Sequence, residues 1–357
     1  MHRGLQWDLL PLPDDNKKSL TVNTESKSRL YPIWLLALIL PVGGSYRRVL
    51  TAAVIMLLLW LGLDALGGKT DPYERLFFSA VIAYSIAIFS RIINQSQRAL
   101  DELTRELDVP DEVMAGQRLS ISHKSALWII ATTLGAVVFA LLHLSLIYGS
   151  RGATFYEALF SGHFVARHIG TLATWLVMTT NISALFYNAL LWARVGRSIE
   201  IDLFRPGAAF IIGRIAVLST LSVVGAQVLF VILIMGQGWD WATVFPGLAA
   251  SFVPAILLFI IPVWPLHKRL QAARQSMLLA VDDDIRKLGP ISEARIRDGA
   301  AIDQFNRLLV MRREVQRVST WPFDGTNLLR IVFYLLLAPL AWVGAALVEN
   351  MVDLILV

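Results

Sequence analysis

The sequence has no cysteine and little charge, and each shortage excludes a class of structure. Without cysteine the chain forms no disulfide, has no thiolate nucleophile and offers no sulfur ligand to zinc or an iron–sulfur cluster. Charged residues make up 17% of its 357 residues, against about 25% in soluble domains. Hydrophobic residues make up 56%, and the mean hydropathy is +0.59. This composition indicates an integral membrane protein.

Sequence signatures of common enzymes are missing as well. The chain has no G-x-S-x-G, no zincin His–Glu pair, no P-loop and no dinucleotide fingerprint. The acidic run at residues 282–284 lacks the glycine and the final glutamate of a calcium loop. His163 and His168 are five residues apart, which does not match the i, i+4 spacing of a helical zinc site. We therefore expect no enzymatic activity, no cofactor and no metal site.

Long apolar stretches recur along the whole chain. A helix needs about 20 apolar residues to cross a hydrocarbon core of about 30 Å. Seven stretches meet or approach this length and are predicted to span the membrane: Val49–Leu66, Leu76–Ile93, Ala126–Tyr148, His168–Trp192, Ile215–Met235, Val244–Val263 and Leu328–Val348. The predicted fold class is therefore an all-α, polytopic transmembrane helix bundle of about seven spans.

A shorter apolar run precedes the first predicted span. It extends from Leu30 to Val42 and has Pro32 and Pro41 near its ends. About 13 residues are too few for a span, so we expect a helix that lies in the membrane interface or dips into it. If this segment did cross the membrane, the orientation of the later loops would not change, and only the amino terminus would lie on the opposite side of the membrane.

The basic residues predict the orientation. Loops on one side of the predicted spans hold 26 lysines and arginines, and loops on the other side hold four: Lys69, Arg75, Arg151 and Arg167. By the positive-inside rule, the amino terminus is expected in the cytoplasm and the carboxyl terminus outside. The predicted parts are a polar cytoplasmic tail (1–30), a membrane bundle with six spans (31–263), a cytoplasmic segment (264–325) and the last span with a short outer tail (326–357).

The cytoplasmic segment is predicted to be a helical hairpin. Apolar residues recur every three or four positions on each side of Gly289-Pro290, which breaks the helix. Eleven basic and eight acidic residues are mixed along it. This mixture is typical of a solvated or self-associating helix pair, so we expect no nucleic-acid binding. A protein partner at the hairpin is left open.

Polar residues inside predicted spans are the first candidates for a site, because burying them in lipid is unfavourable. Five of them could line a polar cavity between the third, fourth and fifth spans: His143, His168, Asn181, Asn188 and Gln227. The alternative is that they form hydrogen bonds between helices, each worth about 0.6 kcal/mol. The acids Asp64 and Glu349 lie near span ends. The lack of a mid-membrane carboxylate argues against an ion-coupled carrier.

Proline recurs in two of the predicted spans. Pro246, Pro254 and Pro262 are spaced by eight residues in the sixth span, and Pro339 lies in the last. Each removes a backbone hydrogen bond, so these positions are candidate kinks or hinges. Broken helices often border a transport path, although prolines are also common in passive membrane helices.

The carboxyl-terminal part carries a family resemblance. Trp321-Pro322-Phe323-Asp324, then Leu328-Leu329-Arg330, then residues 340–349 (LAWVGAALVE) resemble an uncharacterised family of bacterial integral membrane proteins, and Ile201–Pro206 is similar to that family too. The resemblance implies a bacterial inner-membrane location. It implies no activity and assigns no site residue.

Three hypotheses for the function remain. The first is a channel-like or receptor-like oligomer, for which the proline-rich sixth span and the polar residues of the third to fifth spans argue. The second is a transporter or lipid carrier, and the third is a scaffold or signalling subunit acting through the hairpin. Beyond the lipid bilayer, a second copy of the chain is the expected partner.

Overall fold

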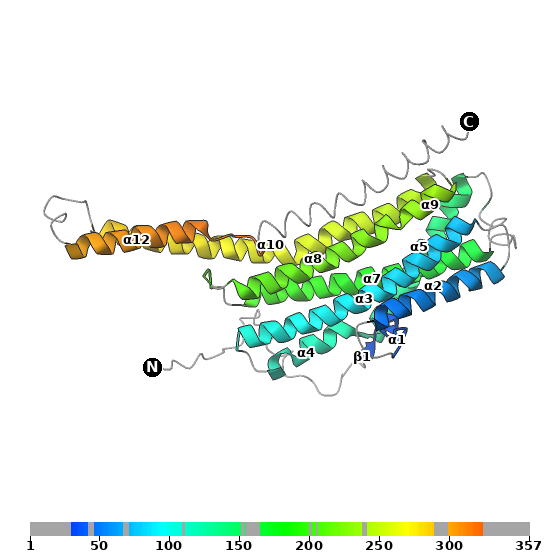
Figure 1. Ribbon diagram of the computed structural model, residues 1–357, viewed down its shortest axis with the longest axis horizontal. Coiled ribbons are helices and arrows are strands. Elements are labelled where there is room, and N and C mark those ends of the chain that lie inside the picture. The colour runs from blue at the N-terminus through cyan, green and yellow to red at the C-terminus, as the bar shows by residue number, and fades with distance from the viewer. Residues whose placement is uncertain are drawn as a thin grey trace.

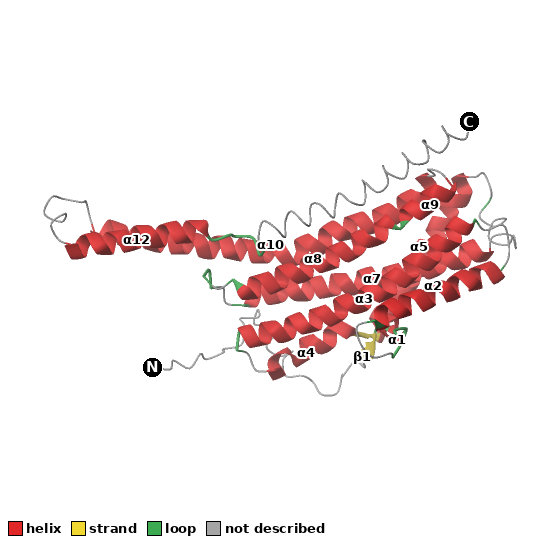
Figure 2. Cartoon of the chain, viewed as in Figure 1, coloured by secondary structure: helices red, strands yellow, loops and turns green. Residues whose placement is uncertain are grey.

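The computed structural model describes residues 30–41, 46–66, 71–108, 111–150, 154, 165–199, 202–204, 206–237, 241–288 and 299–323. These residues form an all-α bundle in which long helices run side by side (Figures 1 and 2). The strands in the described part are β1 (Leu30–Pro32) and β2 (His123–Ser125). The predicted last span, Pro339, His163 and the segments 328–330 and 340–349 lie outside the described residues.

Six helical segments of the described chain are long and apolar enough to cross a membrane. They are α2 (Arg47–Ala65), α3 (Pro72–Glu106), α5 (Ala126–Ser150), α7 (Val165–Ser198), α8 (Gly207–Val228) continued by α9 (Phe230–Gln237), and α10 (Trp241–Leu288). They coincide with the first six predicted spans and confirm the multi-span helical bundle.

Several helices are longer than the predicted spans. α3 has 35 residues and α10 has 48, which at 1.5 Å per residue correspond to about 52 and 72 Å. Both exceed a hydrocarbon core of about 30 Å, and both extend past the start of α2 toward the end of the bundle from which α10 projects (Figure 1). We call this the hairpin end and the opposite one the far end.

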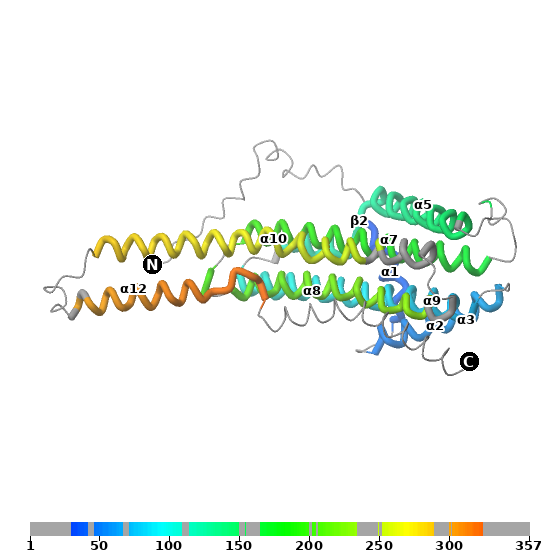
Figure 3. Tube along the Cα trace, turned by 90° about the horizontal axis from the view of Figure 1, so that it is seen from above, coloured from blue at the N-terminus to red at the C-terminus, as the bar shows by residue number. Residues whose placement is uncertain are grey.

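The central helices are α3, α7, α8 and α10. α5 packs on the outer side of α7, and α2 packs on α3 (Figures 1 and 3). Apolar side chains such as Phe89, Leu100 and Trp192 are almost fully buried between them. α2 and α5 bury little of their surface, and most of their exposed side chains are apolar. This distribution fits helices that face lipid.

The hairpin consists of α10 beyond residue 264 and α12 (Gly299–Arg317), which lie side by side (Figure 3). Val281 and Val315 are buried. The Nε of Arg312 lies 2.7 Å from a carboxylate oxygen of Asp282. The loop with Gly289-Pro290 lies outside the described residues.

The chain returns from the hairpin to the bundle through an elbow, which we define as residues 320–323. The Trp321 ring stacks on His267 with centroids 4.1 Å apart, and His267 Nδ1 lies 2.9 Å from the carbonyl oxygen of Thr320. Phe323 is buried, 5.6 Å from Phe259. The elbow is therefore docked on α10.

The apolar run before α2 does not form the continuous helix that we expected. α1 (Trp34–Ala37) is a single turn, and it packs against α3 and α7. Ile33 and Leu35 are fully buried, and Trp34 Nε1 donates to Thr180 Oγ1 over 3.3 Å. β1 pairs with β2 just before α1, which takes residues 30–32 out of any helix. The segment thus dips into the bundle without crossing it.

Lys124, in the middle of β2, is almost completely buried. Its Nζ donates to the carbonyl oxygen of Ser120 and lies 3.9 Å from the centroid of the Tyr187 ring. Burial disfavours the charged amine and lowers the pKa of Lys124 to about 8.

Replacing Lys124 with methionine is expected to stabilise the chain by about 1–2 kcal/mol at pH 7. The fall of the pKa from 10.5 to about 8 corresponds to about 3 kcal/mol, and the loss of the hydrogen bond to Ser120 and of the contact with Tyr187 offsets part of it. Between pH 8 and 10.5 the unfolded native chain binds more protons at this residue than the folded one, so its stability rises with pH. K124M should not show this rise in stability with pH. Melting curves of both proteins at pH 7, 8.5 and 10 in neutral detergent measure the rise, and an equal dependence of the melting temperature on pH in K124M and the native chain would contradict the prediction.

Candidate functional site

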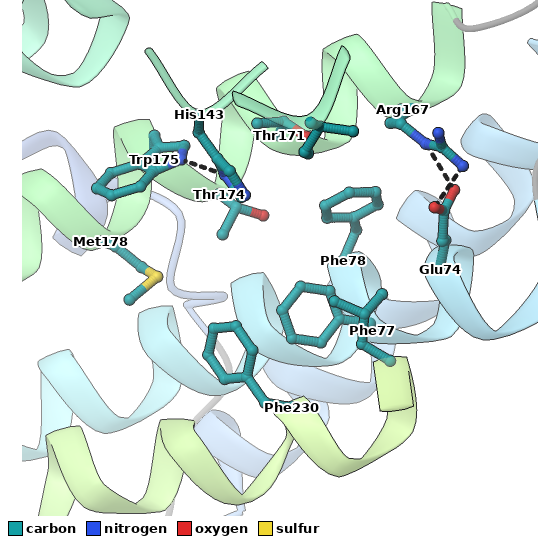
Figure 4. Close-up of a pocket in the computed structure, with 12 residues that line it drawn as sticks. Glu74, Phe77, Phe78, His143, Arg167, Thr171, Thr174, Trp175, Met178 and Phe230 are labelled. Carbon is teal, nitrogen blue, oxygen red and sulfur yellow. Dashed lines mark hydrogen bonds and ion pairs between the residues drawn. The ribbon is translucent and has the colours of Figure 1, made fainter. Parts of the chain in front are cut away.

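A small pocket lies near the far end of the bundle, between α3, α5, α7 and α9 (Figure 4). Its enclosed volume is about 40 Å³, which is room for one to a few water molecules. Most of its wall is apolar. The lining residues are Glu74, Phe77, Phe78, His143, Ile147, Arg167, Thr171, Thr174, Trp175, Met178, Phe230 and Leu233.

A buried ion pair closes one side of the pocket (Figure 4). Arg167 Nη2 lies 2.6 Å from Glu74 Oε1, and Arg167 Nε donates to Glu74 Oε2 over 3.1 Å. The side chains are 10% and 3% exposed, respectively. Glu74 lies in the first turn of α3, where the helix dipole favours an acid. The two-point contact supports charges that would otherwise be costly to bury.

The opposite side of the pocket is formed by a histidine and a tryptophan. Trp175 Nε1 donates to His143 Nδ1 over 3.0 Å, and the rings meet edge to face. Phe139 stacks on Trp175 with centroids 5.3 Å apart. His143 and Trp175 are only partly buried, whereas the other lining residues are buried. This is therefore the wall through which a molecule could enter.

Three phenylalanines make up the apolar floor. The rings of Phe77 and Phe230 lie 4.9 Å apart, and those of Phe77 and Phe78 lie 5.6 Å apart. Phe78 fits because residue 170 is glycine: a Cβ there would lie 2.7 Å from the Cε2 of the Phe78 ring. Gly170 thus allows close packing of α7 on α3.

The helix that carries Phe230 tightens over one turn next to the pocket. α8 ends at Val228 and α9 starts at Phe230, and between them the N–H of Leu229 bonds to the carbonyl three residues back. Two turns earlier, Tyr84 of α3 donates to the backbone carbonyl of Ser222 over 3.0 Å. The backbone at Leu229 stays right-handed helical (φ −69°, ψ −18°), so α8 and the start of α9 form one apolar segment with a tightened turn beside the pocket.

The structure separates the two histidines that were predicted to share a cavity. His143 lines the pocket, whereas His168 Nε2 lies 3.1 Å from the Tyr148 hydroxyl, with the two rings stacked. His168 therefore takes part in a contact between α5 and α7 rather than in the pocket wall.

The predicted amides lie elsewhere along the bundle. Asn181 is buried and donates to the carbonyl of Ser85 over 3.4 Å, which links α7 to α3. Asn188 is buried two turns closer to the hairpin end, and its amide has no hydrogen-bond partner in the described part of the chain. Gln227 is buried on α8. None of the three lines this pocket, so His143 is the one predicted residue of the five in its wall.

The candidate hinges in the sixth span do not break its helix. α10 remains helical through Pro246, Pro254 and Pro262. The tightened helical turn next to the pocket lies at Leu229, where the sequence has no proline.

Sequence reasoning missed the pair of Glu74 and Arg167. Arg167 was assigned to an outer loop, and Glu74 precedes the predicted second span by two residues. Their pairing across 93 positions of sequence depends on how α3 and α7 pack. The sequence did hold a usable signal. An acid (Glu74) and a base (Arg167) each lie within two residues of the far-end border of a predicted span, the second and the fourth.

Comparison of the chain with protein-family models, with curated proteins and with solved structures gives no match. Within the residues that the structure describes, no three histidine or acidic side chains gather as metal ligands. The pocket is therefore the feature of the described chain that indicates a function.

Proposed function

We propose that this chain is a receptor-like membrane protein that binds a small, mainly apolar molecule in the pocket between α3, α5, α7 and α9. The observation that carries the proposal is an aromatic pocket with one buried ion pair and a partly exposed His143–Trp175 wall. Small-molecule sites commonly combine apolar walls with a few fixed polar groups.

The polar groups of the pocket suggest the kind of ligand. The Oγ1 of Thr174 is buried and has no hydrogen-bond partner in the described structure. A ligand with one hydroxyl or N–H group would satisfy it, and its apolar part would contact Phe77 and Phe230. Because the enclosed volume is about 40 Å³, even a single aromatic ring requires the His143–Trp175 wall to move outward.

Phenol and toluene test this proposal, because they have nearly the same shape and differ in a hydroxyl group. We expect phenol to raise the melting temperature of the purified chain in neutral detergent more than toluene does. In T174V the preference for phenol should fall by about fivefold, since one hydrogen bond contributes about 1 kcal/mol. The substitution itself should change stability little, because it removes an unpartnered hydroxyl group.

Two further variants act as controls for the pocket. T104V removes a buried hydroxyl near the other end of α3, where it bonds to the carbonyl of Leu100, and should keep the preference for phenol. M178W should fill the pocket and abolish the response to both compounds. An equal response of M178W and the native chain would mean that the compounds bind elsewhere.

A carrier is the second candidate. The tightened helical turn at Leu229 beside the pocket and the buried carboxylate of Glu74 favour it. A carrier predicts release of bound ligand on the other side of a vesicle, whereas a receptor predicts binding alone. Radiolabelled uptake into vesicles, with M178W as the control, distinguishes the two.

The location is part of the same proposal. The charge bias supports a hairpin end in the cytoplasm and a pocket toward the outside, and the carboxyl-terminal resemblance favours a bacterial inner membrane. A reporter that is active only outside the cytoplasm, fused to the carboxyl terminus, tests the orientation. The hypothesis of a channel-like oligomer stays a prediction, and it concerns the last predicted span. The scaffold hypothesis also stays a prediction, and it concerns partners of the hairpin.

A further inference from the structure

Four arginines gather on α2 and α3, away from the pocket and on the side of the bundle that faces the hairpin end. Arg47 and Arg48 are the first two residues of α2, and Arg91 and Arg98 lie on α3. Arg91 and Arg98 are seven residues apart and therefore share a helix face. Arg48 lies in the repulsive field of the other three.

The packing of α2 on α3 explains why the arginines meet. At the far end Arg75 pairs with Asp64 and lies over the Trp60 ring, 5.2 Å from its centroid. On α2, Arg47 lies 17 residues before Asp64. On α3, Arg91 lies 16 residues after Arg75. At 1.5 Å per residue both lie about 25 Å from that contact. The two helices therefore place these arginines at the same depth.

That depth is the border of the membrane. α2 is a candidate span that begins at Arg47, and 25 Å from the far-end contact is close to the thickness of the hydrocarbon core, about 30 Å. Beyond it α3 continues toward the hairpin end (Figure 1). Arg47, Arg48 and Arg91 thus lie at the level of lipid headgroups. Arg98 lies two turns, about 10 Å, further along α3, and its side chain tilts back toward this level because helical side chains tilt toward the amino terminus of the helix.

No carboxylate of the described chain neutralises the cluster. None of the four arginines takes part in a described ion pair, and the Nε of Arg48 is buried without an acceptor. The nearest acids along α3 are Asp101 and Glu102, which pair with Arg118 and Arg214. Like charges held together without a counter-charge predict an anionic ligand.

The surface beside the cluster indicates which anion this is. α2 continues from the arginines toward the far end with exposed apolar side chains: Val49, Leu50, Leu57, Leu58 and Leu61. A molecule with a phosphate at one end and acyl chains at the other matches both features. Arginine binds phosphate through several N–H donors in a fixed fork, which suits the site.

We propose that Arg47, Arg48, Arg91 and Arg98 bind the headgroup phosphate of an anionic phospholipid whose acyl chains lie along α2. This site is separate from the pocket and does not depend on the proposed ligand function. Basic sites between transmembrane helices at the headgroup level are suited to this role.

Lipid titration of the purified full-length chain in dodecyl maltoside tests the proposal. We expect phosphatidylglycerol to raise the melting temperature and phosphatidylcholine to have a much smaller effect. R91Q/R98Q should bind phosphatidylglycerol about 25-fold more weakly, because each arginine near a membrane surface contributes about a fivefold factor. Both residues are exposed, so the double variant is expected to fold.

The matched control is R307Q/R313Q, which removes two exposed arginines of α12 and should keep the native affinity. An equal loss in both double variants would mean that net charge decides binding and would overturn the site. Equal stabilisation by glycerol 3-phosphate and by phosphatidylglycerol would overturn the lipid as occupant. Binding of phosphatidylcholine as strong as that of phosphatidylglycerol would overturn the role of the arginines.

Discussion

Replacing Arg167 with methionine is expected to destabilise the folded chain by about 3–5 kcal/mol, the largest effect that we predict for one substitution. The change leaves the carboxylate of Glu74 without its partner while the side chain stays 3% exposed. An unpaired buried charge costs this much because neither water nor a counter-charge stabilises it. Unfolding of the purified protein in detergent, followed by circular dichroism against denaturant concentration, measures the loss.

The double variant E74Q/R167M separates the missing partner from lost packing. It removes both charges and should recover most of the stability, since a neutral amide is far less costly to bury than a carboxylate. R214M is the matched control, because its pair with Glu102 is about half exposed and should contribute less than about 1 kcal/mol. A loss in R214M as large as in R167M would contradict a special cost of the buried pair.

Replacing Gly213 with alanine is expected to cost about 2–3 kcal/mol and to displace the elbow. A Cβ at residue 213 of α8 would overlap the carbonyl oxygen of Pro322 and lie 3.1 Å from the Phe323 ring. The obstacle is backbone, which cannot rotate away as a side chain can, so either α8 or the elbow must shift. The buried Phe323 would then lose contacts with Ala216 and Val263.

Hydrogen exchange of residues 319–323 together with the melting temperature checks this prediction. We expect faster exchange at the elbow in G213A and unchanged exchange around the pocket. The control is G62A on α2, where no atom lies within 4 Å of the added Cβ. G62A should be neutral or stabilising by up to about 1 kcal/mol, because alanine favours helix. A G213A protein as stable as G62A would mean that the elbow is not docked on α8.

Part of the candidate site could be predicted from the sequence. His143 stands out as an imidazole in an apolar span, and it does line the pocket. Asn181 and Asn188 stand out for the same reason, but they lie along the inner part of α7, away from the pocket. A polar residue in an apolar run indicates that it needs a protein environment. It does not indicate which helix supplies that environment.

The sequence by itself determined the class of protein and the position of its spans. Apolar length decides whether a helix can cross a bilayer, and this property is local, so the first six predicted spans agree with the helices of the structure. The apolar periodicity beyond residue 264 also predicted the helical arm by which α10 continues into the hairpin. The continuation of α3 past Ile93 to Glu106 was less visible, because an amphipathic helix outside a bilayer has no such length limit.

Only the tertiary structure decided which polar groups meet. Shortages of charge and of cysteine exclude functions but pair no residues. The contact of Glu74 with Arg167, the close approach of Gly213 to the elbow and the gathering of four arginines on α2 and α3 depend on helix register. Register results from the packing of many side chains at once, and no single segment of the sequence specifies it.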